Sequence, residues 1–132
     1  MNSDTEVTRL FRAIGMYDCQ YVRQYIAAGK DVNVSNYQGL TPLHGAAASG
    51  CTRSMKMLIA AGAQVNSTSG TLETPLHVAC DYEQALVVRI LLVAGADTSM
   101  TDNEGRTPLA LILNSQAHDI EKLLRAAEET EK

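Results

Sequence analysis

Short runs of apolar residues at helical spacing, bounded by threonine, proline and glycine, dominate the pattern of this 132-residue chain. In the clearest run Thr41 precedes Pro42, an order typical of an N-cap followed by the first residue of a helix, where proline loses no hydrogen bond. Gly50 is suited to the left-handed conformation that often ends a helix. The pattern therefore predicts a helix over about 42–49 and, from the apolar positions that follow, a second helix that ends at Gly62.

The same arrangement returns at a constant interval along the chain. One shift aligns Thr-Pro-Leu-His at 41–44 with Thr-Pro-Leu-His at 74–77 and with Thr-Pro-Leu-Ala at 107–110. It also aligns the ends of the second helices, which finish on Ala-Gly, at 26–29, 59–62 and 92–95. A period of about 33 residues is typical of stacked helix-turn-helix units. The chain has room for four of them.

The repeated unit resembles the ankyrin repeat. That family combines a turn that contains glycine, Thr-Pro-Leu-His, a pair of small residues, a leucine-rich second helix and Gly-Ala-Asp-Val-Asn. The second unit matches this signature at Gly39, 41–44, 46–47, 57–59 and 62–66. The resemblance implies an all-α fold, an ankyrin-repeat α-solenoid of four helix-turn-helix units with β-turn-like fingertips. We expect a single ankyrin-repeat domain over 1–132, with repeats at about 4–36, 37–69, 70–102 and 103–132.

The last unit is expected to end the array. The segment 87–92 is apolar almost all round, as suits a helix buried between neighbours, whereas 120–125 is apolar on one side only. In the fourth unit Ile112 and Leu113 replace the pair of small residues found at 46–47. A following helix would crowd these larger side chains, so their presence fits the absence of a fifth unit.

The third unit departs from the family pattern at two turns, and we expect it to be the least regular. Leu72 stands where the fingertip glycine belongs, so either Gly70 supplies the unusual backbone geometry or this fingertip has a different shape. Glu83 stands at the position of Gly50. A non-glycine residue in the left-handed conformation there would cost about 1–2 kcal/mol.

Composition and charge narrow the class of protein. With 45% hydrophobic and 20% charged residues, the chain is neither disordered nor membrane-embedded. The net charge of −4 disfavours a nucleic-acid partner, because phosphate binding needs a concentrated positive surface. Lys and Arg outnumber Asp and Glu by six to four in 1–66, whereas Asp and Glu outnumber them by eleven to five in 67–132. We expect this gradient to help orient a partner.

The three cysteines indicate reduced thiols in a cytoplasmic protein, or one that is also nuclear, because their number is odd and their spacing is not that of a metal site. The first residues lack the pattern of a signal peptide, and no apolar stretch approaches the length of roughly 18 residues that a membrane span needs. Cys80 takes the position of a small packing residue and is expected to be buried. Cys19 and Cys51 lie near turns and are expected to be more accessible.

Two histidines are the candidates for a metal site. His44 and His77 hold equivalent positions in successive units, which packed helices keep about 8–10 Å apart, too far for a shared metal ion. The resemblance implies that they form structural hydrogen bonds with Thr41 and Thr74. No set of nucleophile, base and orienting group is suggested by these repeat positions, so we expect no catalytic residue, no metal and no cofactor.

The remaining candidate is a binding surface. In a stacked array the fingertips and the exposed side of each first helix line up into one groove, and ankyrin proteins usually bind partners there. Tyr37, Tyr82 and Arg106 are the best anchors, because aromatic residues and arginine dominate interface energetics. Register assigns the full set of positions: Met16, Tyr37, Gln38, Leu40, Ser49, Thr71, Leu72, Glu73, Asp81, Tyr82, Asn103, Glu104 and Arg106.

We therefore expect a monomeric, non-enzymatic module that binds another protein through its concave groove and acts as an adaptor or inhibitor. Nucleic acid, membrane and small-molecule substrates are not expected among its partners. Two alternatives stay open. One is the recognition module of a larger protein, such as an effector or a ubiquitin-ligase adaptor. The other, less favoured, is an enzyme with a site at Asp81, Tyr82 and Glu83 in the third unit.

Overall fold

Residues 3–130 fold into eight helices that pair in order along the sequence. The computed structural model describes the backbone of residues 3–130 and the side chains of 6–130. The pairs are α1 (Ser3–Gly15) with α2 (Cys19–Ala27), α3 (Pro42–Ser49) with α4 (Thr52–Ala60), α5 (Pro75–Asp81) with α6 (Ala85–Val93), and α7 (Pro108–Ile112) with α8 (His118–Thr130). No strand occurs within 3–130, so the predicted all-α fold is confirmed. None of the helices in this range is long and apolar enough to cross a membrane.

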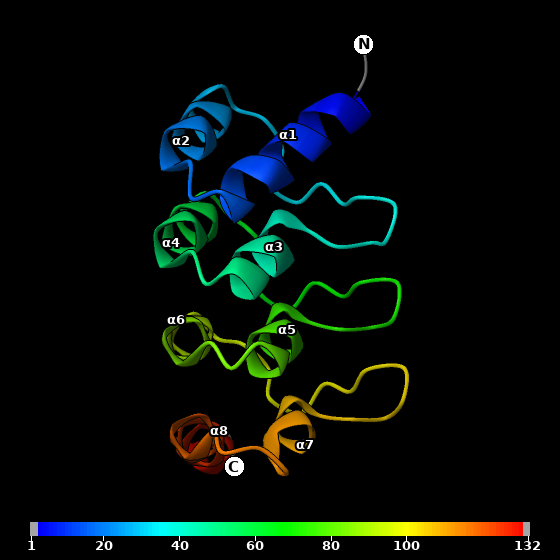
Figure 1. Ribbon diagram of the computed structural model, residues 1–132, viewed down its shortest axis with the longest axis vertical. Helices are drawn as coiled ribbons and strands as arrows, with labels where there is room; N and C mark the ends of the chain where they lie inside the picture. Colours follow the sequence, from blue (N-terminus) through cyan, green and yellow to red (C-terminus); the bar gives the residue numbers. More distant parts are fainter. Residues whose placement is uncertain (1–2, 131–132) are drawn as a thin grey trace.

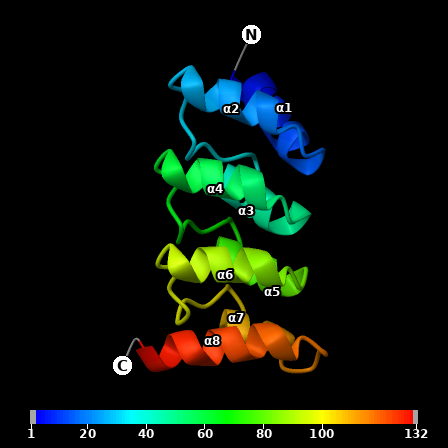
Figure 2. The same cartoon turned by 90° about the vertical axis from the view of Figure 1, so that its left-hand side faces the viewer.

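The four pairs stack in one direction and form two columns (Figure 1). The inner column consists of α1, α3, α5 and α7 and lies next to three long loops that project to one side. The outer column consists of α2, α4, α6 and α8, which lie side by side (Figure 2). Consecutive helices within each column contact each other. We call the three loops fingers, with tips at 36–40, 69–73 and 102–106.

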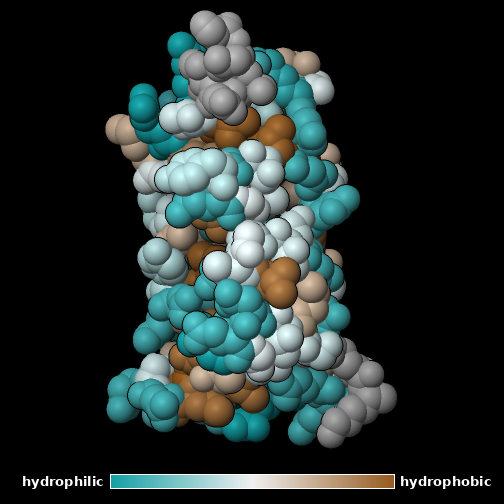
Figure 3. All heavy atoms as spheres, turned by 90° about the vertical axis from the view of Figure 1, so that its right-hand side faces the viewer, coloured by the Kyte–Doolittle hydropathy of each residue, from teal (hydrophilic) through white to brown (hydrophobic). Residues whose placement is uncertain are grey.

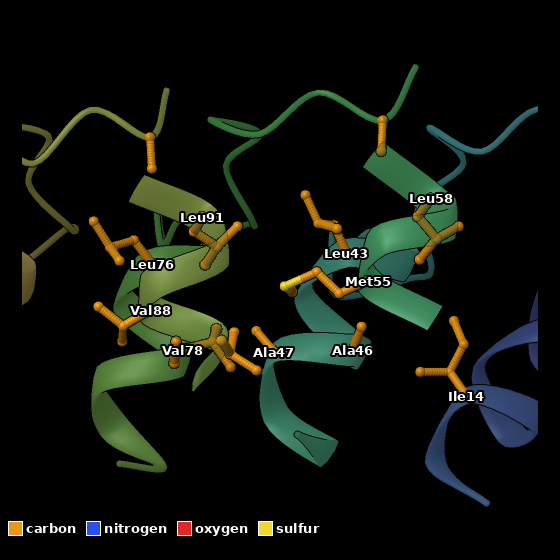
Figure 4. Packing of buried hydrophobic residues seen from close by; sticks show 14 of the residues in the cluster. Ile14, Leu43, Ala46, Ala47, Met55, Leu58, Leu76, Val78, Val88 and Leu91 are labelled. Atoms are coloured by element: carbon orange, nitrogen blue, oxygen red, sulfur yellow. The ribbon is translucent and has the colours of Figure 1, made fainter. Parts of the chain in front are cut away.

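The core lies between the columns and between successive pairs. Ala46 and Ala47 of α3 are fully buried, between Ile14 of α1 and Val78 of α5 (Figure 4). Because these alanines carry nothing beyond Cβ, they allow neighbouring inner helices to approach closely. Larger side chains, also almost fully buried, fill the space toward the outer helices: Leu43, Met55, Leu58, Leu76 and Leu91.

The turn after each inner helix has the same backbone conformation in the first three pairs. Tyr17, Gly50 and Glu83 occupy this turn with φ of 61°, 75° and 51°. Glu83 thus has the left-handed conformation at the position where the second pair has Gly50. Tyr17 and Glu83 both adopt a conformation that is costly for a residue with a side chain.

The fingertip turns repeat in the same way. Gly39, Leu72 and Gly105 have φ of 77°, 63° and 75°. Each of these residues donates its backbone N–H to the carbonyl three residues earlier, at 2.9–3.0 Å. Leu72 itself, and not Gly70, therefore supplies the left-handed geometry, and the finger keeps the shape of its neighbours, so both sequence-based explanations for this turn are wrong.

The third pair is as regular as the second, contrary to the prediction. Its helices α5 and α6 have seven and nine residues, close to the eight and nine of α3 and α4. The helix that differs most in length from the other inner helices is α7, which has five residues. At its end Ile112 is buried, while Leu113 is 52% exposed at the last layer of the stack.

Candidate protein-binding surface

Each finger is closed by one side chain at the same register position. Asn36 Oδ1 accepts hydrogen bonds from the backbone N–H groups of residues 38 and 40, at 2.9 and 3.0 Å. Ser69 Oγ and Asp102 Oδ1 accept the equivalent pairs in the next two fingers. Three different residue types thus produce one finger shape, because each offers an oxygen at the same place.

The fingers are also bonded to one another. The Gly70 N–H donates to the carbonyl of Gln38 at 3.0 Å, and the Asn103 N–H donates to the carbonyl of Thr71 at 3.0 Å. These bonds join the tips of neighbouring fingers directly. The fingers therefore form a continuous ledge whose backbone is held in place before any partner binds.

The two histidines connect the inner helices to this ledge. His44 Nδ1 accepts the Thr41 N–H at 3.0 Å, and His44 Nε2 lies 2.8 Å from the carbonyl oxygen of Glu73. His77 repeats both bonds with Thr74 and with the carbonyl of Arg106. The predicted structural bonds to the threonines are confirmed. Each histidine also reaches the following finger, which could not be read from one unit alone.

The hydrogen bonds of His44 settle its tautomer. A backbone N–H can only donate and a carbonyl oxygen can only accept, so Nδ1 is unprotonated and Nε2 carries the hydrogen. Burial lowers the pKa of His44 below its ordinary value of 6.5, with a smaller contribution from nearby His77, while the bond to Glu73 acts in the opposite direction. Both bonds suit the neutral ring, so these histidines serve the framework of the surface.

Large apolar and aromatic side chains stand exposed on this framework. Tyr37 is 95% exposed, Met16 73%, Tyr82 60% and Leu72 48%. All four were predicted as binding residues from their register. Figure 3 looks onto the fingers and shows hydrophobic side chains in recesses between mostly polar projections. Surface of this kind is typical of a contact site for another macromolecule.

The first two fingertips enclose a hollow of about 590 Å³. Tyr37, Gln38 and Leu40 line it from one finger, and Thr71 lines it from the next. Leu40 is half-buried, so it forms part of the wall. The structure thus brings together predicted residues that belong to two different repeats.

Other predicted positions differ in their surroundings. Ser49 is half-buried and its hydroxyl donates to the carbonyl of Ala46 at 3.3 Å, while Glu73 is half-buried beside its own finger. Asp81, Asn103 and Glu104 are exposed.

Tyr17 is an exposed residue that was not predicted from the sequence, although the repeat places it at the position equivalent to Gly50. It is 56% exposed, and its hydroxyl donates to the carbonyl of Ser49.

Arg106 is held in place by carboxylates. Its Nε lies 3.0 Å from Asp102 Oδ2, and its Nη2 lies 3.7 Å from Glu104 Oε1. Burial alone would raise the pKa of Asp102, but the backbone N–H groups of Arg106 and Glu104, together with the guanidinium, hold it below the usual value. Arg106 therefore presents a pre-positioned guanidinium at the third fingertip, while part of its charge is compensated.

Comparison with known families agrees with this geometry. A family described as ankyrin repeats (3 copies) matches residues 10–102, well over half of the chain. The chain belongs to the ankyrin-repeat family. A search of curated proteins found no match. Ankyrin repeats are generally protein–protein interaction modules and are typically non-enzymatic.

The cysteines of this ankyrin-repeat protein are framework residues. Cys80 is 1% exposed, as predicted, and burial followed by the charge of Asp81 raises its pKa to about 12, the direction opposite to that of a nucleophile. Cys51 is also buried, at 2%, so the prediction that it would be accessible is wrong. It lies under the turn between α3 and α4, where its Sγ donates to Ser54 Oγ at 3.2 Å. Cys19 is half-buried.

The region named as an alternative enzyme site in the third repeat is a turn on the surface. Asp81, Tyr82 and Glu83 are all exposed; α5 ends at Asp81, and Tyr82 is its C-cap. Among the residues that the structure describes, no group of three or more His, Cys, Asp and Glu side chains could hold a metal ion. The ledge and the adjoining inner helices remain the candidate surface.

Proposed function

We propose that this ankyrin-repeat protein binds a segment of one partner protein along the concave surface formed by the fingers and the inner helices. It acts there as a non-enzymatic adaptor or inhibitor. The observation that carries the proposal is the exposure of Tyr37, Met16, Tyr82 and Leu72 together with the hydrogen bonds that join each finger to the next. Such a surface loses little conformational entropy on binding, which leaves more of the contact energy as affinity.

The partner is expected to contact both aromatic anchors. Tyr37 lies at the first fingertip and Tyr82 at the end of α5, so a partner that covers both spans two repeats. We count α7 with α8 as a fourth repeat and treat the four pairs as one domain, since both columns continue through them (Figures 1 and 2). The protein then acts as an inhibitor when it covers the bound segment, or as an adaptor when it bridges that segment to another protein. The chain works as a monomer.

Affinity purification from lysate, with mass spectrometry of the bound proteins, tests the proposal. Tyr37→Ala combined with Tyr82→Ala should abolish capture of the main partner that the wild type captures, because truncation of aromatic anchors at an interface often costs about 2 kcal/mol or more. Both tyrosines are largely exposed, so the unfolding curve should hardly change.

A matched control removes two exposed apolar side chains from the opposite face. Leu86 is 66% and Val93 85% exposed on α6, in the outer column. Leu86→Ala combined with Val93→Ala should leave capture of this same main partner intact, and any other protein lost with the control is counted as a separate partner. If the control abolishes capture and the tyrosine pair does not, the partner binds elsewhere and the concave surface is not the site.

A further inference from the structure

The outer column carries a row of cations that takes no part in the concave surface. Arg23 on α2, Lys56 on α4 and Arg89 on α6 stand at equivalent positions of successive repeats, and all three are exposed. These three helices lie side by side on one face (Figure 2), so equivalent positions form a line along the stack. Lys122 holds the equivalent position on α8. We call Arg23, Lys56 and Arg89 the cationic row.

The cationic row has no counter-charge on its own helices. None of α2, α4 and α6 contains an Asp or Glu. Among the side chains of residues 6–130, the ion pairs involve other cations, namely Lys30, Arg106 and Arg125. A positive face therefore persists on a chain whose net charge is −4, and charge of one sign along a surface attracts a partner of the opposite sign.

Apolar hollows lie between the cations. The larger, of about 480 Å³, is bordered by Lys56 and Arg89 and lined by Ile59, Ile90 and Val93. The second, of about 370 Å³, lies between α2 and α4 beside Arg23 and is lined mainly by Ile26, Met57 and alanines. Three cations and two apolar hollows thus alternate along the stack, in the order Arg23, the smaller hollow, Lys56, the larger hollow and Arg89.

The apolar part of this face is open to solvent. Val93 is 85% exposed at the larger hollow, and Leu86, earlier on α6, is 66% exposed. Valine and leucine side chains are normally buried, and an exposed patch of them bordered by charged residues is typical of a surface that contacts another macromolecule.

We propose that the outer face binds an acidic amphipathic helix of a partner protein, laid along the stack with its carboxylates on the cationic row and its apolar side chains in the two hollows. Successive outer helices are about 8–10 Å apart. In an α-helix, residues seven positions apart are separated by about 10.5 Å. Carboxylates at i, i+7 and i+14 therefore match Arg23, Lys56 and Arg89.

The apolar side chains fit the same register. In a helix the residues at i+3 and i+4 lie on the face of residue i, between i and i+7. Leucine or isoleucine at these positions would stand over the hollows while the carboxylates meet the cations. The proposal concerns a second surface and does not depend on the concave one.

An anionic membrane matches this face less well than a helix. At its α8 end the same column carries Asp119, Glu128 and Glu129 beside Lys122, and these carboxylates would be repelled by a negative bilayer. A helix that covers only α2, α4 and α6 avoids them. The hollows are also recessed between helices, which favours single side chains over a flat surface.

The probe is a fluorescein-labelled peptide of about 20 residues with Glu at i, i+7 and i+14, Leu at the i+3 and i+4 positions between them, and Ala and Gln elsewhere. Fluorescence anisotropy at low salt measures its affinity for the whole chain. Lys56→Glu combined with Arg89→Glu should weaken binding by about tenfold or more, and Val93→Ser by about threefold. Binding should also weaken as salt is added.

Three controls test the register and the location. A peptide of the same composition with Glu at i, i+4 and i+8 should bind at least about fivefold more weakly than the first peptide, because its carboxylates cannot reach three outer helices. Arg23→Glu should weaken binding by about threefold. Arg9→Glu combined with Arg12→Glu on α1 changes the net charge as much as the Lys56 and Arg89 pair and should have little effect.

Several results would overturn the proposal. Equal affinity for the two peptides, or no effect of Arg23→Glu, would exclude a helix laid along the row. Binding of phosphatidylserine vesicles that depends on Lys56 and Arg89, without binding of the peptide, would assign the face to a membrane. Self-association in sedimentation experiments that is lost with the same variant would assign it to a second copy of the chain. Unfolding curves of each variant show whether a loss reflects the surface or the fold.

Discussion

Two neighbouring helix pairs, α3 with α4 and α5 with α6, differ at two of the turns where the backbone has positive φ. The second repeat has Gly39 and Gly50 at these turns, and the third has Leu72 and Glu83. All four residues have φ between 51° and 77°. The backbone conformation is therefore the same with glycine and without it, so something other than the local residue imposes it.

Hydrogen bonds between repeats explain this identity at the fingertips. His44 and His77 each reach the carbonyl of the next finger at 2.8 Å, and neighbouring fingertips are joined at 3.0 Å in both cases. The bond between Gly70 and Gln38 joins the tips of Gly39 and Leu72, and the His44 bond holds the finger of Leu72 as well. At the fingertips tertiary contacts therefore enforce the turn, and glycine only lowers its conformational cost.

Loss of a histidine should be the most damaging change, and should damage both repeats alike. His44→Ala removes a buried side chain and leaves the Thr41 N–H and the Glu73 carbonyl without this partner. The expected cost is about 2–4 kcal/mol in the free energy of unfolding by urea. His77→Ala should cost the same within about 1 kcal/mol, since the two sites share both bonds.

A much smaller cost for one histidine would show that the two repeats are not equivalent. Tyr37→Ala is the reference for a surface change, because Tyr37 is 95% exposed. It should alter the free energy of unfolding by less than about 0.5 kcal/mol.

The two repeats should differ most clearly in the stability cost of a substitution at the fingertip. A Cβ on Gly39 would lie 2.7 Å from the backbone nitrogen of Gly70, and the φ of Gly39 is also unfavourable for a side chain. Gly39→Ala should therefore lower the free energy of unfolding by about 2 kcal/mol. Leu72→Ala, at the equivalent position, should cost less than about 0.5 kcal/mol, because Leu72 already carries a Cβ there and is half-exposed. Equal costs in thermal or urea unfolding would contradict this account.

At the turn between the helices, the comparison predicts a gain in stability. Glu83 adopts φ of 51° where the second repeat has glycine. Glu83→Gly should raise the free energy of unfolding by up to about 1 kcal/mol, because relief of the left-handed conformation outweighs the added freedom of the unfolded chain. An exposed glutamate loses few contacts on removal. A fall in stability would mean that the Glu83 side chain supports the turn.

The last expected effect concerns the pH dependence of stability. The folded chain holds the pKa of His44 below 6.5, so the unfolded state binds a proton first as the pH falls. The contribution of the neutral ring is fully present above about pH 6.5 and is lost progressively below it, by less than about 1.4 kcal/mol per pH unit. Urea unfolding at about pH 7.5 and about pH 5.5 should show this loss. His44→Gln should reduce the difference between the two values, and an unchanged pH dependence would assign it to other groups.

The candidate surface could be located from the sequence to a considerable extent, because a strict period carries positions from one repeat to the next. Tyr37, Leu72 and Tyr82 are exposed as their register indicates. The cationic row Arg23, Lys56 and Arg89 obeys the same period, yet it emerges as a surface only when α2, α4 and α6 are seen side by side. The buried state of Cys51 could not be read from its place near a turn, because position next to a turn does not by itself determine exposure: Cys51 is 2% exposed.

Local rules determine the positions of the helices, the period of the repeat and the all-α class, because proline, threonine caps and apolar spacing act over a few residues. Contacts between layers follow from no single repeat. The finger-to-finger hydrogen bonds, the reach of each histidine into the next finger and the left-handed Leu72 all depend on residues of an adjacent repeat. Stacking supplies the energy for them, because each pair buries its apolar side only against the next.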